Sequence, residues 1–249
     1  MNCDRREFLK MSAAFLGTFF IAPEILAGEK IKMALVIDDF GENSRYVKWF
    51  LDLNVPLTFA ILPRLRHSKD IALMADSAGH EVILHQPMEN LNRRLNPGPG
   101  ALYVCDSEDK MRDTLDYNIS SIPFIKGVNN HGGSRFTTCL KEMTYVLKII
   151  DSHGLYFIDS GTASKTVAYK AAKSLGMRTA KVDEFLDHRN DVARIRKSFY
   201  YLKEIGRKRG SVLGIGHDRI LTIANLKTLV KDIDIQFIYA SEFIGVTKK

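Results

Sequence analysis

Runs of apolar residues alternate along the chain with segments of helical periodicity. Residues 31–37 read IKMALVI and predict a buried strand, and residues 44–53 have a helical pattern with Ser44 as a candidate N-cap. Further strands are predicted at residues 57–62, 81–84, 125–129, 156–158, 179–182, 211–215 and 236–239. Further helices are predicted at residues 68–78, 107–120, 137–152, 164–175, 191–209 and 220–231.

This order of about eight strands and about seven helices indicates an α/β fold. The strands are continuously apolar rather than alternating, which is typical of a parallel sheet covered by helices on both faces. A (β/α) barrel, complete or incomplete, is the first expectation, and an open doubly wound sheet is the alternative. Periodicity does not separate the two. We see no internal repeat and no linker, so residues 28–249 are expected to form a single domain.

The first 27 residues differ in character from the rest of the chain. Arg5-Arg6 is followed by Phe-Leu-Lys, then by a moderately apolar run over residues 11–22, and then by the small residue Ala27. This pattern resembles a twin-arginine export signal. The run is too short to span a bilayer comfortably, so no membrane span is expected in the mature chain. The resemblance implies a periplasmic or secreted protein.

Composition adds few constraints. The chain has 249 residues, of which 45% are hydrophobic and 26% are charged, with a formal net charge of +7. No block of like charges and no nucleic-acid-binding motif occurs, so a nucleic acid partner is not expected. Cys105 and Cys139 are the cysteines outside the signal, and without a CxxC pair they do not indicate a zinc or redox site. Whether they pair is left open, as is the oligomeric state.

Polar residues gather at the ends of the predicted strands. They are Asp38-Asp39, His85, Asn129-Asn130-His131, Asp159, Asp183 and His217. The carboxyl ends of parallel strands share one face of the sheet, and sites are built there. Two adjacent carboxylates with three histidines are a suitable inventory for a divalent metal site with acid–base partners. Each residue alone has a structural explanation, such as helix capping by Asp38.

Several stretches together resemble a known family. They are ALVIDDFG, GHEVILHQPME, PGPGAL, GVNNHGGSRFT, FIDSGT, DEFLD and GIGH. The chain is similar over roughly residues 31–245 to the divergent branch of the polysaccharide deacetylases, within the glycoside hydrolase/deacetylase superfamily. This resemblance implies a distorted (β/α)7 barrel and an acetylated polysaccharide or another glycan as partner.

The resemblance also implies roles for individual residues. Asp38 matches the general base, Asp39 a metal ligand, and His217 the general acid. The family's His-x-x-x-His metal pair is represented by His85 and Glu89, so the second histidine is missing. The family's Arg-x-Pro-Tyr segment is replaced by NNHGGSRF.

The third metal ligand has two candidates. His131 is favoured, because zinc commonly takes two nitrogens and a carboxylate. Glu89 is second, because Pro87 should prevent a helical turn that would stack Glu89 on His85.

The expected activity is a zinc-dependent removal of acetyl groups from a polysaccharide. Arg135 and Asp159 are candidates for orienting Asp38 or the substrate, and a long loop with Arg93 and Arg94 could flank a glycan groove. One alternative is a glycan- or metal-binding envelope protein without turnover. A third reading is a glycoside hydrolase that pairs Asp38 with Asp159 or Asp183.

Overall fold

The computed structural model describes residues 29–246, so the predicted export signal lies outside the described residues. The strands are β1 (Ile31–Phe40), β2 (Thr58–Ile61), β3 (Glu81–Met88), β4 (Gly127–Gly132), β5 (Tyr156–Asp159), β6 (Thr179–Lys181), β7 (Glu184–Phe185), β8 (Ser211–His217) and β9 (Ile235–Ile238). The helices are α2 (Val47–Leu51), α3 (Ser68–Ser77), α4 (Glu108–Ser121), α5 (Leu140–Ser152), α6 (Ala168–Ser174), α7 (Val192–Arg209), α8 (Ile220–Leu229) and α9 (Ala240–Val246), and Phe136–Thr138 form a 3₁₀ turn.

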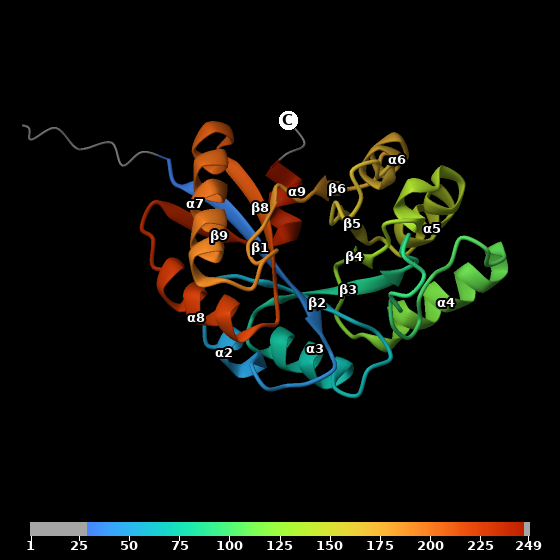
Figure 1. Ribbon diagram of the computed structural model, residues 1–249, viewed down its shortest axis with the longest axis horizontal. Coiled ribbons are helices and arrows are strands. Elements are labelled where there is room, and N and C mark those ends of the chain that lie inside the picture. Colours follow the sequence, from blue (N-terminus) through green and yellow to red (C-terminus); the bar gives the residue numbers. More distant parts are fainter. Residues whose placement is uncertain (1–28, 247–249) are drawn as a thin grey trace, which may run out of the picture.

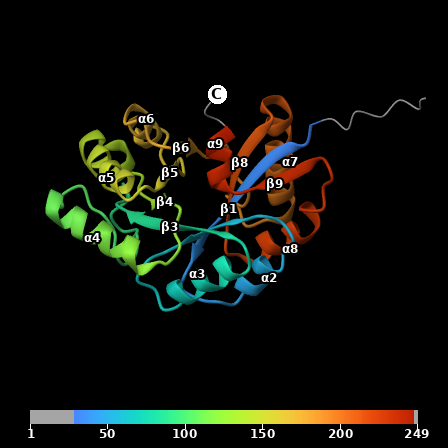
Figure 2. The same ribbon diagram turned by 180° about the vertical axis from the view of Figure 1, so that it is seen from behind.

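All strands of the sheet run parallel, in the order β6-β5-β4-β3-β2-β1-β8-β7. The first half of β1 pairs with β9 and the second half with β2. The sheet curls, and α9 lies between its two sides (Figures 1 and 2). The edge strands β6 and β7 do not pair with each other in the described chain. The expected incomplete (β/α) barrel is therefore confirmed, and the doubly wound alternative is set aside.

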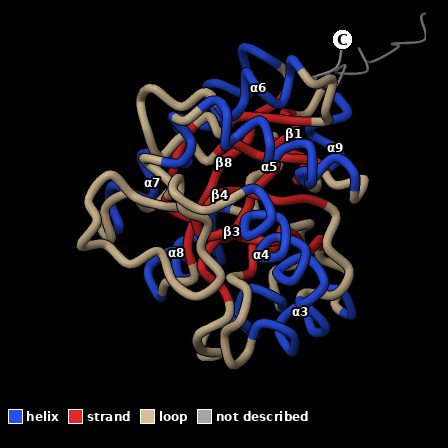
Figure 3. The backbone as a smooth tube through the Cα atoms, turned by 90° about the vertical axis from the view of Figure 1, so that its right-hand side faces the viewer, coloured by secondary structure: helices blue, strands red, loops and turns tan. Residues whose placement is uncertain are grey.

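The two faces of the curled sheet have separate cores. Helices surround the outer face (Figure 3), and Met33, Leu35 and Ile37 of β1 point into that layer. Ala34 and Val36 belong to a smaller inner cluster, which α9 helps to fill. Side chains on a strand alternate between the two faces, so the parity of a residue number determines which core it joins.

Two of the helix boundaries follow the expected capping chemistry. The Ser107 side chain accepts a hydrogen bond from the Lys110 amide at 3.2 Å at the start of α4. The Asp191 side chain accepts one from the Arg194 amide at 2.9 Å at the start of α7. Each cap satisfies an amide that the first helical turn leaves unpaired. Among the described helices, none is both long and apolar enough to cross a membrane.

Candidate metal and acid–base site

Three side chains converge at the carboxyl ends of β1, β3 and β4. Asp39 Oδ1 lies 3.3 Å from His85 Nε2 and 3.0 Å from His131 Nδ1, and the two nitrogens are 3.1 Å apart. The donor atoms of tetrahedral zinc, at about 2.0–2.1 Å from the ion, stand about 3.3 Å from one another. The spacing and chemistry of this group therefore fit a zinc-sized divalent cation.

The backbone of Asp39 explains how two consecutive aspartates reach one site. Neighbouring residues on a strand normally point to opposite faces. Asp39 has a φ of 72°, and the pairing of β1 with β2 shifts register between Ile37 and Phe40. This bulge turns Asp39 toward the same end of the sheet that Asp38 faces. Asp39 Oδ1 is buried, and its only close polar neighbours among the described residues are His85 Nε2 and His131 Nδ1, so its lone pairs are available to a cation that these nitrogens also bind.

Asn129 connects the metal group to Asp38. Its Nδ2 donates to Asp38 Oδ1 at 2.9 Å, and its Oδ1 lies 2.7 Å from His85 Nδ1. A carboxylate only accepts hydrogen bonds, so the amide nitrogen must face Asp38 and the amide oxygen must face His85. His85 then carries its proton on Nδ1, and the Nε2 lone pair points toward Asp39 and His131.

Asp38 is a buried carboxyl beside the metal group. Its Oδ2 lies 3.5 Å from His85 Nε2. Burial raises the pKa of Asp38, against the opposing effects of His85 and His217. Burial also opposes the charge on Asp39, but the adjacent His131 and His85 outweigh it and hold the pKa of Asp39 below its ordinary value. The two neighbouring carboxyls therefore have different affinities for a proton, as a base and a ligand require.

His217 lies opposite Asp38 on the neighbouring strand β8. Its Nδ1 is 2.6 Å from Asp187 Oδ1, and Asp187 also accepts from the His217 amide and from Thr222 Oγ1. Burial alone would lower the pKa of His217, but the hydrogen bond and charge of Asp187 prevail and raise it. A histidine kept protonated in this way can act as an acid.

Sequence reasoning missed Asn129 and Asp187 as contributors. Asn129 was visible only as one of several polar strand-end residues. Asp187 ends the stretch DEFLD, and its position beside His217 depends on how the segment after β7 folds against β8. Asp218 was also missed. Burial and the charge of Asp39 raise the pKa of Asp218 to about 6, and its Oδ1 has no hydrogen-bond partner within residues 29–246.

The structure does not bring Glu89 into the metal group. Strand β3 stays extended through Pro87 to Met88, so Glu89 lies four extended residues, about 13 Å of strand, beyond His85 rather than one helical turn away. Its carboxylate contacts Arg135 Nη1 at 2.5 Å and accepts from the Val104 amide at 2.9 Å. Of the two candidates for third ligand, His131 is the one that meets Asp39 and His85.

Arg135 and Asp159, the candidates for orienting Asp38 or the substrate, make no hydrogen bond or ion pair with Asp38 in the described part of the chain, and a role toward the substrate stays a prediction. Arg135 pairs with Glu89, and Asn129 holds Asp38. Asp159 lies two residues after Phe157 on β5, so both side chains point to the outer face of the sheet. The Asp159 carboxylate accepts hydrogen bonds from the Gly161 amide and from Thr166 Oγ1. It organises the connection into α6 rather than the site.

Asp183 lies away from Asp38 as well. Its carboxylate binds Arg209 and the Leu213 amide. Neither Asp159 nor Asp183 therefore faces a groove together with Asp38, which removes the carboxyl pairs on which a glycoside hydrolase reading depended. Cys105 and Cys139 are both free thiols in the structure.

A surface pocket of about 600 Å³ lies beside the long loop that follows β3. Glu89, Arg93, Tyr103 and Arg135 are among its lining residues. The predicted role of this loop at a groove is consistent with that position, while Arg94 is exposed and does not line the pocket.

Comparisons with known proteins place the chain in a family. Residues 35–244 match the family model described as divergent polysaccharide deacetylase. The chain is 31% identical over 240 residues to the uncharacterized protein YibQ of Escherichia coli K12, which covers 96% of this chain and 74% of YibQ.

Two solved structures share the fold. An uncharacterized protein from Agrobacterium tumefaciens C58 has a TM-score of 0.81 and 24% identity, over 86% of this chain and 89% of that one. A family 4 carbohydrate esterase from Streptomyces lividans, solved in complex with acetate, has a TM-score of 0.52 and 9% identity, over 86% of this chain and 95% of that one. The match over residues 35–244 is decisive, and the chain belongs to the divergent polysaccharide deacetylase family.

Proposed function

We propose that this protein is a metal-dependent hydrolase that removes acetyl groups from a carbohydrate polymer. The observation that carries the proposal is the group of Asp39, His85 and His131, with donor atoms 3.0–3.3 Å apart, next to a buried carboxyl and a histidine of raised pKa. Family membership supports the same reaction class.

The metal ligands would be Asp39 Oδ1, His85 Nε2 and His131 Nδ1. Zinc in such a site lowers the pKa of a water molecule and polarises a carbonyl group. The donor set of two imidazoles and one carboxylate is one that zinc accepts in catalytic sites. His85 is presented to the ion in the correct tautomer by Asn129.

The chain's own residues would move two protons. Asp38, held by Asn129, would accept a proton from the attacking water. His217, held by Asp187, would donate a proton to the departing amine or alkoxide. Water adds to the acetyl carbonyl, the bond to the sugar nitrogen or oxygen breaks, and acetate leaves together with the free amine or hydroxyl.

The substrate would approach over the carboxyl ends of the strands. The pocket that Arg93, Tyr103 and Arg135 line is suited to hold neighbouring sugar units, since it combines an aromatic ring with hydrogen-bond donors. Export through the twin-arginine-like signal, residues 1–27, would bring the enzyme to envelope or extracellular polymers.

The test combines metal analysis with acetate release. Purified wild-type protein is compared with Asp38→Ala, His85→Ala and the control His188→Ala, whose side chain is exposed and outside the site. We expect about one bound metal ion and acetate release from acetylated oligosaccharides for wild type and control. His85→Ala should lose both, and Asp38→Ala should keep the metal and lose acetate release.

Two outcomes decide against the proposal. A wild-type protein that binds metal but releases no acetate from any acetylated glycan would instead be a binding protein. A wild-type protein that neither binds metal nor releases acetate above the level of His85→Ala would be neither the proposed hydrolase nor a metal-binding protein.

A further inference from the structure

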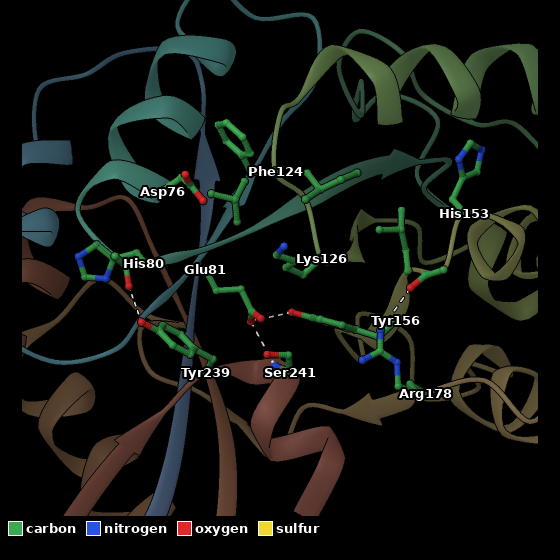
Figure 4. A pocket seen from close by; sticks show the side chains of 15 residues that line it. Asp76, His80, Glu81, Phe124, Lys126, His153, Tyr156, Arg178, Tyr239 and Ser241 are labelled. Carbon is green, nitrogen blue, oxygen red and sulfur yellow. Dashed lines mark hydrogen bonds between the residues drawn. The ribbon is translucent and has the colours of Figure 1, made fainter.

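The inner face of the sheet carries polar residues at both ends. On β3 this face presents Glu81, Ile83 and His85 in turn, so a carboxylate lies at the opposite end of the strand from the metal group. At that opposite end a cavity of about 630 Å³ opens among the segments that lead into β3, β4 and β5 (Figure 4). The inner apolar cluster, which includes Ile83 and Ile158, separates the two ends. The cavity is therefore a different site from the proposed catalytic one.

Glu81 provides the chemistry of this cavity. Its side chain is buried, with 8% of the residue exposed. Oε1 accepts hydrogen bonds from Thr58 Oγ1 at 2.9 Å, from the Tyr156 hydroxyl at 2.9 Å and from the Ser241 amide at 3.2 Å. Oε2 has no hydrogen bond or ion pair among the described residues. Oε2 is not one of the buried side-chain atoms that lack a partner, so it is reached from the cavity that Glu81 lines, and as a carboxylate oxygen it can accept a hydrogen bond from a group bound there.

Aromatic side chains form much of the wall. Phe124, Tyr156 and Tyr239 line the cavity together with Glu81 (Figure 4). Phe124 leaves 51% of its surface exposed, and its φ of 63° is rare for a bulky residue. Strained backbone of this kind persists where the surrounding structure requires a particular side-chain position. Here it presents an aromatic ring at the mouth of a cavity.

The charges around the cavity restrict the class of ligand. Asp76 and Glu81 are balanced by Lys126 and Arg178. Arg178 already donates to the Gly154 carbonyl at 3.2 Å. A cationic ligand would meet Lys126 and Arg178, and an anionic ligand would meet the two carboxylates. A hydroxyl group can bind to both the carboxylates and the cationic side chains, because it donates a hydrogen bond to Glu81 Oε2 and accepts one from Lys126.

We propose that this cavity binds a neutral saccharide. Its volume lies within the usual range of small-molecule pockets. Sugar hydroxyls would donate to Glu81 Oε2 and accept from Lys126, and an apolar ring face would lie against Phe124. The site would hold the protein on a glycan independently of turnover, and this proposal does not depend on the deacetylase activity.

Binding of two defined probes tests the proposal. Cellotetraose and tetra-N-acetylchitotetraose are titrated calorimetrically into the full-length protein, and saturation-transfer NMR identifies bound sugar protons. Glu81→Gln keeps an oxygen for Tyr156 and Ser241 but replaces the free acceptor by a donor, and Phe124→Ala removes the exposed ring. Both variants should weaken binding of at least one probe by about tenfold or more.

Two controls separate this site from the catalytic one. Tyr201→Ala removes another exposed aromatic ring, on α7, and should leave binding unchanged. His85→Ala should leave cellotetraose binding unchanged, because cellotetraose offers no acetyl group to the proposed catalytic site, even though the variant abolishes the proposed deacetylation. Thermal unfolding checks that each variant is folded, and if Glu81→Gln is not, Phe124→Ala decides the question. The proposal is overturned if neither probe binds, or if binding survives Phe124→Ala and folded Glu81→Gln.

Discussion

The side-chain oxygen of Asn129 lies 2.7 Å from Nδ1 of His85. The amide nitrogen of the same residue donates to Asp38, so one buried side chain fixes both the tautomer of a proposed metal ligand and the orientation of the proposed base. Such partners of a ligand contribute to metal affinity without touching the ion.

We predict that Asn129→Ala weakens zinc binding by about 10- to 100-fold, because His85 loses the acceptor that holds its proton on Nδ1. Competition with a chromogenic chelator measures the affinity. The matched control is Asn225→Ala, which removes another buried asparagine that donates to the Leu221 carbonyl on α8. Equal zinc affinity in wild type and Asn129→Ala would show that the amide has no such role.

Replacement of Asp187 tests the proposed acid. His217 must be protonated to donate, so activity is present below its pKa and is lost as the pH rises through it. Asp187 raises the pKa of His217. Asp187→Asn should therefore move the alkaline fall of kcat/KM to lower pH, by about one to three units.

The matched control for Asp187→Asn is Thr222→Val. It removes the hydrogen bond from Thr222 Oγ1 to Asp187 and leaves the charge in place, so its alkaline limb should stay close to that of wild type. If the limb of Asp187→Asn coincides with that of wild type, His217 is not the group that titrates there.

The choice of third metal ligand is tested by a pair of substitutions. His131→Ala removes a nitrogen that lies 3.0 Å from Asp39 Oδ1, and we expect it to lose most of the bound zinc. Glu89→Gln keeps the side-chain shape and should retain wild-type zinc content, because Glu89 contacts Arg135 and the Val104 amide instead. Mass spectrometry of metal content distinguishes the two ligand sets, and the reverse result would restore Glu89 as the ligand.

The sequence was sufficient for the parallel order of elements and for the convergence of Asp39, His85 and His131. The residues at which the strands end were harder to predict from the sequence. Strands β1, β3, β4 and β8 all continue beyond the residue at which their continuous apolar run ends. Backbone hydrogen bonds between strands do not require apolar side chains, so a strand can continue through polar residues. The polar residues at the carboxyl ends were therefore predicted to lie after the strands, whereas they belong to them.

The face on which a residue points was partly predictable. Asp159 follows Phe157 by two positions, and the alternation of a strand places both on the outer face. Other features depend on tertiary contacts that no local pattern contains. Asp187 meets His217 only because the segment after β7 packs against β8, and α9 was missed because a short helix on the inner face has no distinctive periodicity.

The resemblance of residues 1–27 to a twin-arginine export signal leads to a separate prediction about location. Replacing Arg5 and Arg6 together by lysine should abolish export by the twin-arginine pathway and leave the precursor in the cytoplasm. Cell fractionation and immunoblotting of a bacterial host measure this, with Arg45→Lys in the exposed loop after β1 as the control. Unchanged export of the double variant would assign the first 27 residues to another pathway.

Asn118 anchors the long loop that lines the surface pocket near Arg93. Its Nδ2 donates to Gln86 Oε1 and to the Gly100 carbonyl, both at 2.8 Å, and its Oδ1 accepts from Arg64 Nε at 2.7 Å. Asn118→Ala would leave the buried Gln86 Oε1 and the Arg64 Nε–H without the partner that Asn118 provides, while the Gly100 carbonyl keeps its hydrogen bond from Gln86 Nε2. We expect the free energy of unfolding to fall by about 2–4 kcal/mol.

The same substitution should raise KM for a polymeric substrate more than it lowers kcat, because Asn118 holds the loop and lies apart from the metal group. Urea unfolding and steady-state kinetics measure the two effects. Asn54→Ala, which removes an exposed asparagine, should change stability by less than about 0.5 kcal/mol. A stable Asn118→Ala protein with wild-type KM would mean that the loop is held by other contacts, such as the pairing of Met88 with Leu102.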